Sequence, residues 1–264
     1  MSGRAIVITS GKGGVGKTTT TANLGLGLAK HDRKVALVDA DIGLRNLDII
    51  MGLENRIVYH LVDVIRGRCQ LRQALVKDKR FPHLSMLPAS QIDQKDAITP
   101  EEMKSLTSQL KEEFDFVLID CPAGIEQGFR NAVAGADEAI VITTPDVSPV
   151  RDADRVIGLL QSSLGDPQLI INRMSTDMVK RGDMLDQQDV LDILAVRLLG
   201  IVPEDEEVLV AGNRGAPVVL NDSSRSGRAF DRIVRRLLGE DVPIPELNGH
   251  GGIMNRLGKL IFRR

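Results

Sequence analysis

Short apolar runs alternate along the chain with longer segments of helical periodicity. Several runs are unbroken stretches of Val, Ile and Leu, such as AIVIT and FVLI, and not alternating apolar and polar positions. Unbroken runs are expected for strands whose two faces are both covered by helices. The pattern therefore predicts βαβ units around a mostly parallel twisted sheet. Expected strands are 5–9, 34–38, 84–87, 116–119, 139–143, 168–171 and 198–202, and expected helices include 18–30, 100–113, 150–164, 187–195 and 226–238.

The periodic pattern ends near residue 239. The stretch GEDVPIPELNGHGG, residues 239–252, is rich in Gly and Pro and has no convincing period, which is typical of a linker. A length of 264 residues suits one large α/β domain. The predicted organisation is therefore a domain at 1–238, a linker at 239–252 and a short helix at 253–264.

Composition narrows the functional classes. Hydrophobic residues make up 42% of the chain and charged residues 27%, with a net charge of −2, so the whole chain is not a nucleic-acid polycation. Cys69 and Cys121 form no CxxC pair, which argues against a disulfide framework or a thiolate metal site and fits a reducing cytoplasm. The first residues do not read as a signal peptide, and no apolar run approaches the roughly 20 residues that span a bilayer. If the protein meets a membrane, we expect it to lie on the surface.

A phosphate-binding loop follows the first expected strand. Residues 11–18, GKGGVGKT, match the pattern G-x-x-x-x-G-K-[ST] and directly precede an expected helix. The glycines let successive backbone N–H groups point at phosphate oxygens, and the helix adds its positive N-terminal end. Lys17 is expected to reach the β- and γ-phosphates of ATP and Thr18 to ligate Mg²⁺. The residues predicted to hold the phosphates are Gly11, Lys12, Gly13, Gly14, Val15, Gly16, Lys17, Thr18 and Thr19.

Three aspartates stand where expected strands end. Asp120 closes FVLID, and Asp39 and Asp41 close KVALVDAD. Ligands of open α/β sheets bind at this carboxyl edge, and a phosphate loop needs both a magnesium partner and a group that places the attacking water. The alternative is that strand-end aspartates merely cap helices or turns. For Asp120 and Asp41 the motif context outweighs this alternative, whereas for Asp39 both alternatives remain.

The second lysine of the loop makes the motif more specific. With Lys12 in KGGVGKT, the loop resembles that of the deviant Walker A (ParA/MinD) family of P-loop ATPases. The resemblance implies a nucleotide-sandwich dimer in which Lys12 touches the partner subunit's phosphates; the alternative is a solvated loop lysine. DCPAG resembles the Walker B aspartate and second switch, so that Gly124 senses the γ-phosphate. By the same resemblance Asp41 lies in the first switch and orients water or Mg²⁺, and Asn46 helps to position the water.

Two further pairs match where this family contacts the adenine base. Asn172 and Arg173 follow the apolar run QLII, and Pro203 and Asp205 follow LLGIV. Both pairs are expected at the carboxyl edge of the sheet. Polar loop residues are often only turn formers, which is the alternative for these positions.

The C-terminal segment GIMNRLGKLIFRR is the strongest signal outside the ATPase motifs. On a helix, Ile253, Met254, Leu257, Leu260 and Ile261 fall within an arc of about 120°, flanked by Arg256, Lys259 and Arg263. The segment carries four basic and no acidic residues, so the remainder of the chain has a net charge of −6. A basic amphipathic helix after a linker is typical of a membrane-surface element. The alternatives are a helix docked on the protein's own core and a basic arm on nucleic acid, against which the apolar arc argues.

Nearly the whole chain resembles the septum-placing branch of this family, through VDADIGLRNLD, DCPAG, VRDADRVIG and the tail. The resemblance implies a slow ATP hydrolase, dimeric with ATP, on the cytoplasmic membrane face. It also implies recruitment of the division inhibitor MinC, release stimulated by MinE, and a partner surface at Asp152 and Asp154. Those two are otherwise ordinary solvated charges. The rivals are a ParA-like DNA-partition ATPase, an iron–sulfur electron-transfer protein and a non-catalytic scaffold.

Overall fold

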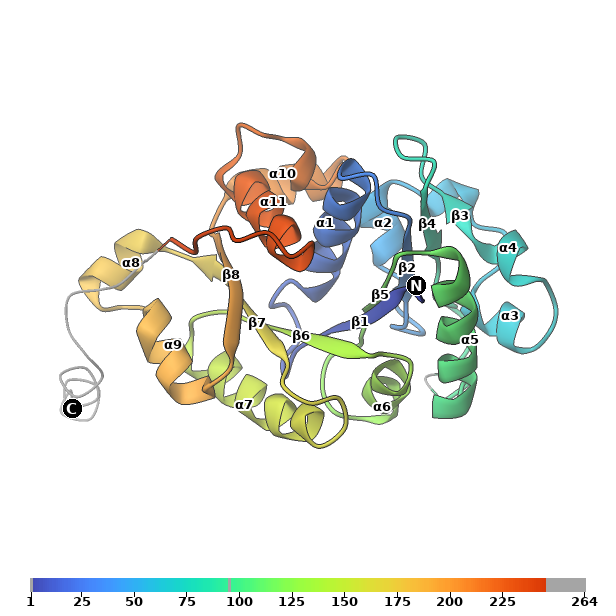
Figure 1. The fold of residues 1–264 in the computed structure, drawn as a ribbon, viewed down its shortest axis with the longest axis horizontal. Helices are drawn as coiled ribbons and strands as arrows, with labels where there is room; N and C mark the ends of the chain where they lie inside the picture. The colour runs from blue at the N-terminus through green and yellow to red at the C-terminus, as the bar shows by residue number, and fades with distance from the viewer. Residues whose placement is uncertain (1, 95, 246–264) are drawn as a thin grey trace.

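A twisted eight-stranded sheet forms the centre of the computed structural model, which describes residues 2–94 and 96–245 (Figure 1). The strand order is β3-β4-β2-β5-β1-β6-β7-β8, and every neighbouring pair is parallel except β3 with β4. The predicted mostly parallel P-loop fold is therefore confirmed for the described residues. The strands are β1 (Arg4–Thr9), β2 (Val35–Asp39), β3 (Val76–Lys77), β4 (Leu84–Leu87), β5 (Phe116–Asp120), β6 (Glu138–Thr143), β7 (Gln168–Met174) and β8 (Arg197–Pro203).

Helices cover both faces of the sheet (Figure 1). Successive residues of β1 point to opposite faces, so Ala5 and Val7 pack with α5, α6, α7 and α9, and Ile6 and Ile8 pack with α1, α2 and α11. Two buried faces explain why the strand sequences are unbroken apolar runs. The helices are α1 (Lys17–Lys30), α2 (Leu47–Met51), α3 (Leu61–Ile65), α4 (Leu71–Ala74), α5 (Pro100–Glu113), α6 (Gln127–Ala134), α7 (Val147–Gln161), α8 (Thr176–Arg181), α9 (Gln187–Leu194), α10 (Glu206–Asn213) and α11 (Arg225–Leu237), with 3₁₀ turns η1 (Glu54–Arg56) and η2 (Val218–Leu220).

Two boundaries differ from the sequence prediction. Helix α7 begins at Val147 and not at residue 150, because Pro149 falls in the first turn, where its missing N–H breaks no helical bond. Strand β7 continues to Met174, so Asn172 and Arg173 lie inside the strand. The prediction that they follow the strand was wrong. A register shift against β8 occurs here, and Arg173 adopts a left-handed φ of 56°.

The C-terminal part of the prediction lies mostly beyond the described residues. After α11 the described residues 239–245 contain no helix or strand. The predicted membrane-binding residues of 253–264 lie outside the described residues. Within the part of the chain that the structure describes, no helix is long and apolar enough to cross a membrane.

Candidate nucleotide site

The predicted phosphate loop connects β1 to α1 at the carboxyl edge of the sheet. Gly14 and Gly16 adopt φ values of 79° and 99°, in the left-handed region that side chains other than glycine rarely occupy. Lys17, the first residue of α1, is only 8% exposed, whereas Lys12 is exposed on the outer side of the loop. The loop therefore carries one lysine inside and one outside.

Asn172 fixes the shape of this loop from β7. Its side-chain Nδ2 donates a hydrogen bond of 2.8 Å to the backbone oxygen of Val15. A Cβ at Gly16 would lie 2.3 Å from the same nitrogen, so the side chain packs directly against the loop backbone. The sequence predicted Asn172 as an adenine contact. The structure gives it a phosphate-loop contact, and the adenine contact stays a prediction.

The other predicted adenine residues surround the end of β8. Pro203 is the last residue of that strand, and Asp205 is the N-cap of α10. The Asp205 carboxylate accepts hydrogen bonds from the Ser224 hydroxyl at 2.8 Å and from the Ser226 backbone N–H at 3.1 Å. Asp205 thus joins the β8 end to the start of α11, and its contact with a base stays a prediction.

Two buried aspartates lie side by side at the ends of β2 and β5. Asp39 is the register partner of Asp120. Burial raises the pKa of Asp120 to about 7, although hydrogen bonding by Thr18 and the charge of Lys17 limit the rise. Burial also raises the pKa of Asp39 well above its usual value, and the neighbouring charge of Asp120 adds to this effect. Two carboxyl groups that resist ionisation side by side are suited to a cation, which favours their charged forms.

Asp39 has a visible structural role, which resolves part of the open alternative. Its Oδ1 accepts a hydrogen bond from the backbone N–H of Asp41 at 3.0 Å, and its Oδ2 accepts one from Leu47 at 3.3 Å. These bonds hold both ends of the loop between β2 and α2. The half-buried Asp41 and the exposed Asn46 lie on this loop, at the same edge of the sheet as the phosphate loop. Their roles toward water and Mg²⁺ remain predictions.

Helix α7 packs directly against the phosphate loop. A Cβ added at Gly11 would lie 2.3 Å from the carbonyl carbon and oxygen of Asp152. The Nζ of Lys12 donates a hydrogen bond of 3.2 Å to the Ser148 hydroxyl in the first turn of the helix. Asp152 is half-buried and Asp154 is exposed. The helix that carries the predicted partner surface therefore contacts the phosphate loop at the backbone of Gly11 and at the side chain of Lys12.

The loop after β5 completes the site from the other side. Gly124 has a φ of 91°, and a Cβ at Gly13 would lie 3.9 Å from the Cβ of Ala123. The predicted second switch therefore borders the phosphate loop. Two contacts of the site were not predicted from the sequence: the Thr21 hydroxyl donates to Asp120 Oδ1 at 3.2 Å, and the Ser148 hydroxyl accepts a hydrogen bond from Lys12 Nζ. The repeated threonines of α1 gave no signal that distinguishes Thr21 from its neighbours.

This arrangement fits a nucleoside triphosphate with Mg²⁺. The loop backbone and Lys17 suit the phosphates, and Thr18 and Asp120 suit the metal. Within the described ranges, no group of three or more His, Cys, Asp and Glu side chains is placed to hold a metal ion. Mg²⁺ commonly uses one or two protein oxygens and takes its other ligands from phosphates and water, so the small donor set is compatible with it.

Known proteins resemble this chain over most of its length. The family model described as an AAA domain matches residues 3–160. The septum site-determining protein MinD of Bacillus subtilis (strain 168) is 56% identical over 248 residues, which cover 93% of this chain and 92% of that protein. A chain of the MinC:MinD cell division protein complex from Aquifex aeolicus is 49% identical, with a TM-score of 0.86 over 92% of this chain and 99% of that one. MinD of Pyrococcus horikoshii OT3, solved with Mg-ADP, is 31% identical, with a TM-score of 0.81 over 90% and 99% of the two chains.

Proposed function

Since the chain belongs to the MinD family of septum site-determining proteins, we propose that it is a switch that ATP assembles on the membrane and hydrolysis releases. As a member of this family it is a P-loop ATPase that uses nucleotide and Mg²⁺ in the placement of the division septum. In the proposed cycle ATP joins two copies, and the dimer binds the cytoplasmic face of the cell membrane. The dimer recruits a MinC-type division inhibitor, and a MinE-type partner stimulates hydrolysis.

The observation that carries the proposal is the placement of two lysines on one phosphate loop. Lys17 is buried beside Asp120 at the start of α1, where it serves the protein's own nucleotide. Lys12 is exposed, and its Nζ donates a hydrogen bond of 3.2 Å to the Ser148 hydroxyl. An exposed lysine on the loop is free to exchange this weak contact for the phosphates of a second copy.

Exposed apolar side chains support a partner at the same edge. Leu44, Ile92 and Val147 are 59%, 87% and 57% exposed, and they lie on the segments that follow β2, β4 and β6. These segments lie at the same carboxyl edge of the sheet as the phosphate loop, which follows β1. Large apolar side chains gathered at one edge mark an interaction surface, and burial against a second copy would remove them from water.

A partner on α7 has a short route to the nucleotide. The backbone of Asp152 packs against Gly11. Asp154, two residues further along the helix, is exposed and therefore accessible to a partner protein. A displacement of α7 would therefore move the phosphate loop or release Lys12 from Ser148. This contact supports the proposed action of MinC- and MinE-type partners at Asp152 and Asp154.

Membrane binding is proposed for the segment 253–264. A helix shorter than about 12 residues is marginal in water, so the segment would fold on the lipid surface. Each basic residue near an anionic leaflet contributes roughly 1 kcal/mol, and one segment alone would bind weakly. Two segments on one dimer would make the second contact intramolecular and strengthen binding by about 10²–10⁴. Dimerisation by ATP would then control attachment.

The dimerisation step is tested by the mass of the protein in solution with ATP and with ADP. We expect a dimer with ATP and a monomer with ADP. Lys12→Ala should remain monomeric with ATP although it still binds the nucleotide. Lys34→Ala is the matched control, because Lys34 is also exposed but precedes β2 at the opposite edge of the sheet. A Lys12→Ala variant that dimerises like the wild type would contradict the proposal.

The enzymatic step is tested separately. Asp41→Ala should abolish ATP turnover while ATP still produces the dimer, because Asp41 is proposed to act on water and not to hold the two copies together. Turnover at the wild-type rate in this variant would remove Asp41 from the proposed mechanism. A wild-type protein that binds ATP but never hydrolyses it would leave only a nucleotide-gated scaffold.

A further inference from the structure

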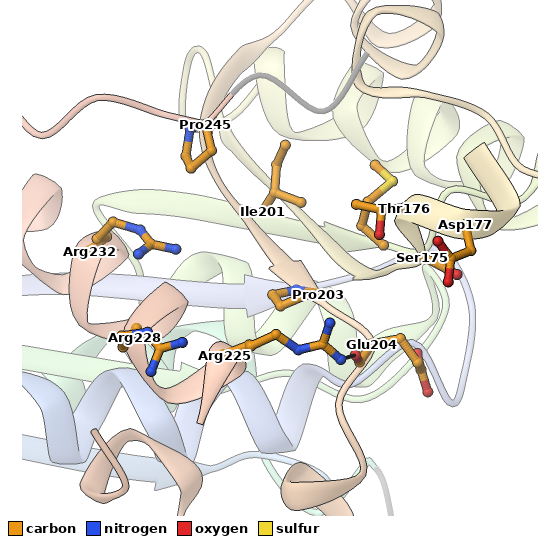
Figure 2. Close-up of a pocket in the computed structure, with 11 residues that line it drawn as sticks. Ser175, Thr176, Asp177, Ile201, Pro203, Glu204, Arg225, Arg228, Arg232 and Pro245 are labelled. Carbon is orange, nitrogen blue, oxygen red and sulfur yellow. Dashed lines mark hydrogen bonds between the residues drawn. The ribbon is translucent and has the colours of Figure 1, made fainter. Parts of the chain in front are cut away.

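A pocket of about 350 Å³ lies beyond the end of β8, between α11 and the start of α8 (Figure 2). Ile201 and Pro203 form its floor, and Thr176 and Asp177 border it from the α8 side. Three arginines of α11, Arg225, Arg228 and Arg232, line the other wall, and we call this site the α11 arginine pocket. The proposed mechanism of ATP hydrolysis uses none of the three.

The three arginines stand on one face of α11 because they are spaced by three and four residues. Arg228 Nη1 donates to the backbone oxygens of Asp222 and Ser223 at 3.0 and 2.8 Å, and Arg225 Nη2 donates to the backbone oxygen of Glu204 at 3.3 Å. Across residues 2–94 and 96–245, none of the three forms an ion pair, and Arg232 makes no side-chain hydrogen bond. Their positive charge is therefore not neutralised by a direct carboxylate contact in the described structure.

The described part of the chain ends at this pocket. Pro245, which precedes the segment 246–264, lines the pocket beside Arg232 and Ile201 (Figure 2). Arg236 ties the preceding residues to α11, because its Nε and Nη2 donate to the backbone oxygens of Val242 and Pro243, both at 2.7 Å. Only residues 246–252 separate Pro245 from the predicted membrane helix, and an extended chain of that length reaches at most about 25 Å. A membrane-bound tail would thus hold the pocket close to the lipid surface.

We propose that the α11 arginine pocket binds the phosphate headgroups of anionic phospholipids and so orients the domain on the membrane. This inference rests on the proposed membrane attachment. A guanidinium group offers several N–H donors in a plane that matches phosphate oxygens, which makes arginine well suited to a headgroup. Attraction between exposed charges falls off within about 8 Å at physiological salt, so an arginine site helps only where the tail already brings lipid near.

The test uses the full chain with ATP and two kinds of vesicle, one containing phosphatidylglycerol and one of phosphatidylcholine alone. The variant is Arg225→Gln with Arg232→Gln; Arg228 is kept because its bonds support the turn before α11. Each lost charge should weaken binding to the anionic vesicles about fivefold, which corresponds to ~1 kcal/mol, and the pair up to about 25-fold. Binding to phosphatidylcholine should not change.

A matched control removes the same charge elsewhere. Arg130→Gln with Lys104→Gln alters α6 and α5, which cover the other face of the sheet from α11 (Figure 1). Both side chains are exposed. We expect this variant to bind anionic vesicles as the wild type does. An equal loss of vesicle binding in the control would show that the effect depends only on the net charge of the protein, and it would overturn the proposal.

Other outcomes separate the pocket from the wider function. Wild-type binding that the pocket variant retains in full would overturn the pocket and leave membrane attachment standing. A wild type that never binds vesicles would overturn the proposed attachment itself, and the pocket with it. Weaker binding of a fluorescent ATP analogue by the pocket variant would show that the pocket belongs to the nucleotide site, which Pro203 is predicted to share, and would overturn the headgroup proposal. Loss of duplex-DNA binding without loss of vesicle binding would assign it to nucleic acid.

Discussion

Substitution of Gly11 tests whether α7 and the phosphate loop act as one unit. Gly11 is not among the glycines with a positive φ, so its backbone conformation tolerates alanine. The obstacle is contact: the added Cβ would lie 2.3 Å from the carbonyl carbon and oxygen of Asp152 and 2.6 Å from its Cβ. These atoms belong to a helix backbone and its first side-chain carbon, so no rotamer change relieves the overlap.

The size of the effect follows from the distances. Real Cβ atoms essentially never lie within 3.0 Å of such atoms, so the loop or the helix must move by at least ~0.7 Å. Overpacking of this kind costs about 1–3 kcal/mol of folding free energy. The loop is the smaller element and should move more. Because each 1.4 kcal/mol is a factor of ten in binding, we expect Gly11→Ala to bind ATP about tenfold more weakly or worse.

Two measurements check this prediction: urea unfolding followed by circular dichroism, and titration with a fluorescent ATP analogue. Gly158→Ala is the control on the same helix, because Gly158 is exposed and a Cβ there meets nothing within 4 Å. That control should be neutral or more stable by up to ~1 kcal/mol. A Gly11→Ala protein with wild-type stability and ATP affinity would refute the contact between the loop and α7.

Three further predictions concern the buried polar groups. The raised pKa of Asp120, about 7, means that the folded protein holds this proton more tightly than the unfolded chain. Without Mg²⁺ and nucleotide, the contribution of Asp120 to wild-type stability should therefore be fully present below about pH 4 and be lost as pH rises to about 7. Asp120→Asn should lose less stability over this pH range and show no ATP turnover, and equal pH profiles of the two proteins in urea unfolding would contradict this prediction. Asn172→Ala removes the hydrogen bond to the backbone oxygen of Val15. The free energy of unfolding should therefore fall by about 1–3 kcal/mol, and the affinity for ATP should fall with it. An unchanged midpoint of urea unfolding would show that the bond is dispensable. Chelation of Mg²⁺ should abolish hydrolysis and weaken ATP binding, and addition of Mg²⁺ should restore both; turnover that persists in excess chelator would rule out the proposed metal role.

The sequence predicts the sheet well because its signals are local. Each buried strand is a run of β-branched and aliphatic residues, and the phosphate loop is a contiguous motif between such a run and a helix. The short helices α2, α3 and α4 were missed, since four or five residues cannot display a helical period. The start of α7 was predicted three residues late, because a proline in the first turn is compatible with a helix and Pro149 lies there.

Contacts in the site between residues far apart in the chain could not be predicted from the sequence pattern. Asn172 and Val15 are 157 positions apart, and only the pairing of strands brings the amide onto the loop. Thr21 stands in a run of four threonines, and nothing in their sequence indicates that Thr21 joins Thr18 in hydrogen bonding to Asp120. Asp39 remained ambiguous until its two bonds to the β2–α2 loop were known. In each case the sequence shows which polar residue is present, but the residue to which it hydrogen-bonds becomes known only from the structure.

The central claim is that ATP controls attachment to a membrane through the C-terminal segment. The most direct test is sedimentation of the protein with anionic vesicles, with ATP or with ADP, for the full chain and for a chain that stops before Gly252. We expect that only the full chain with ATP sediments with the vesicles. Equal binding by the shortened chain, or no binding by the full chain with either nucleotide, would contradict it.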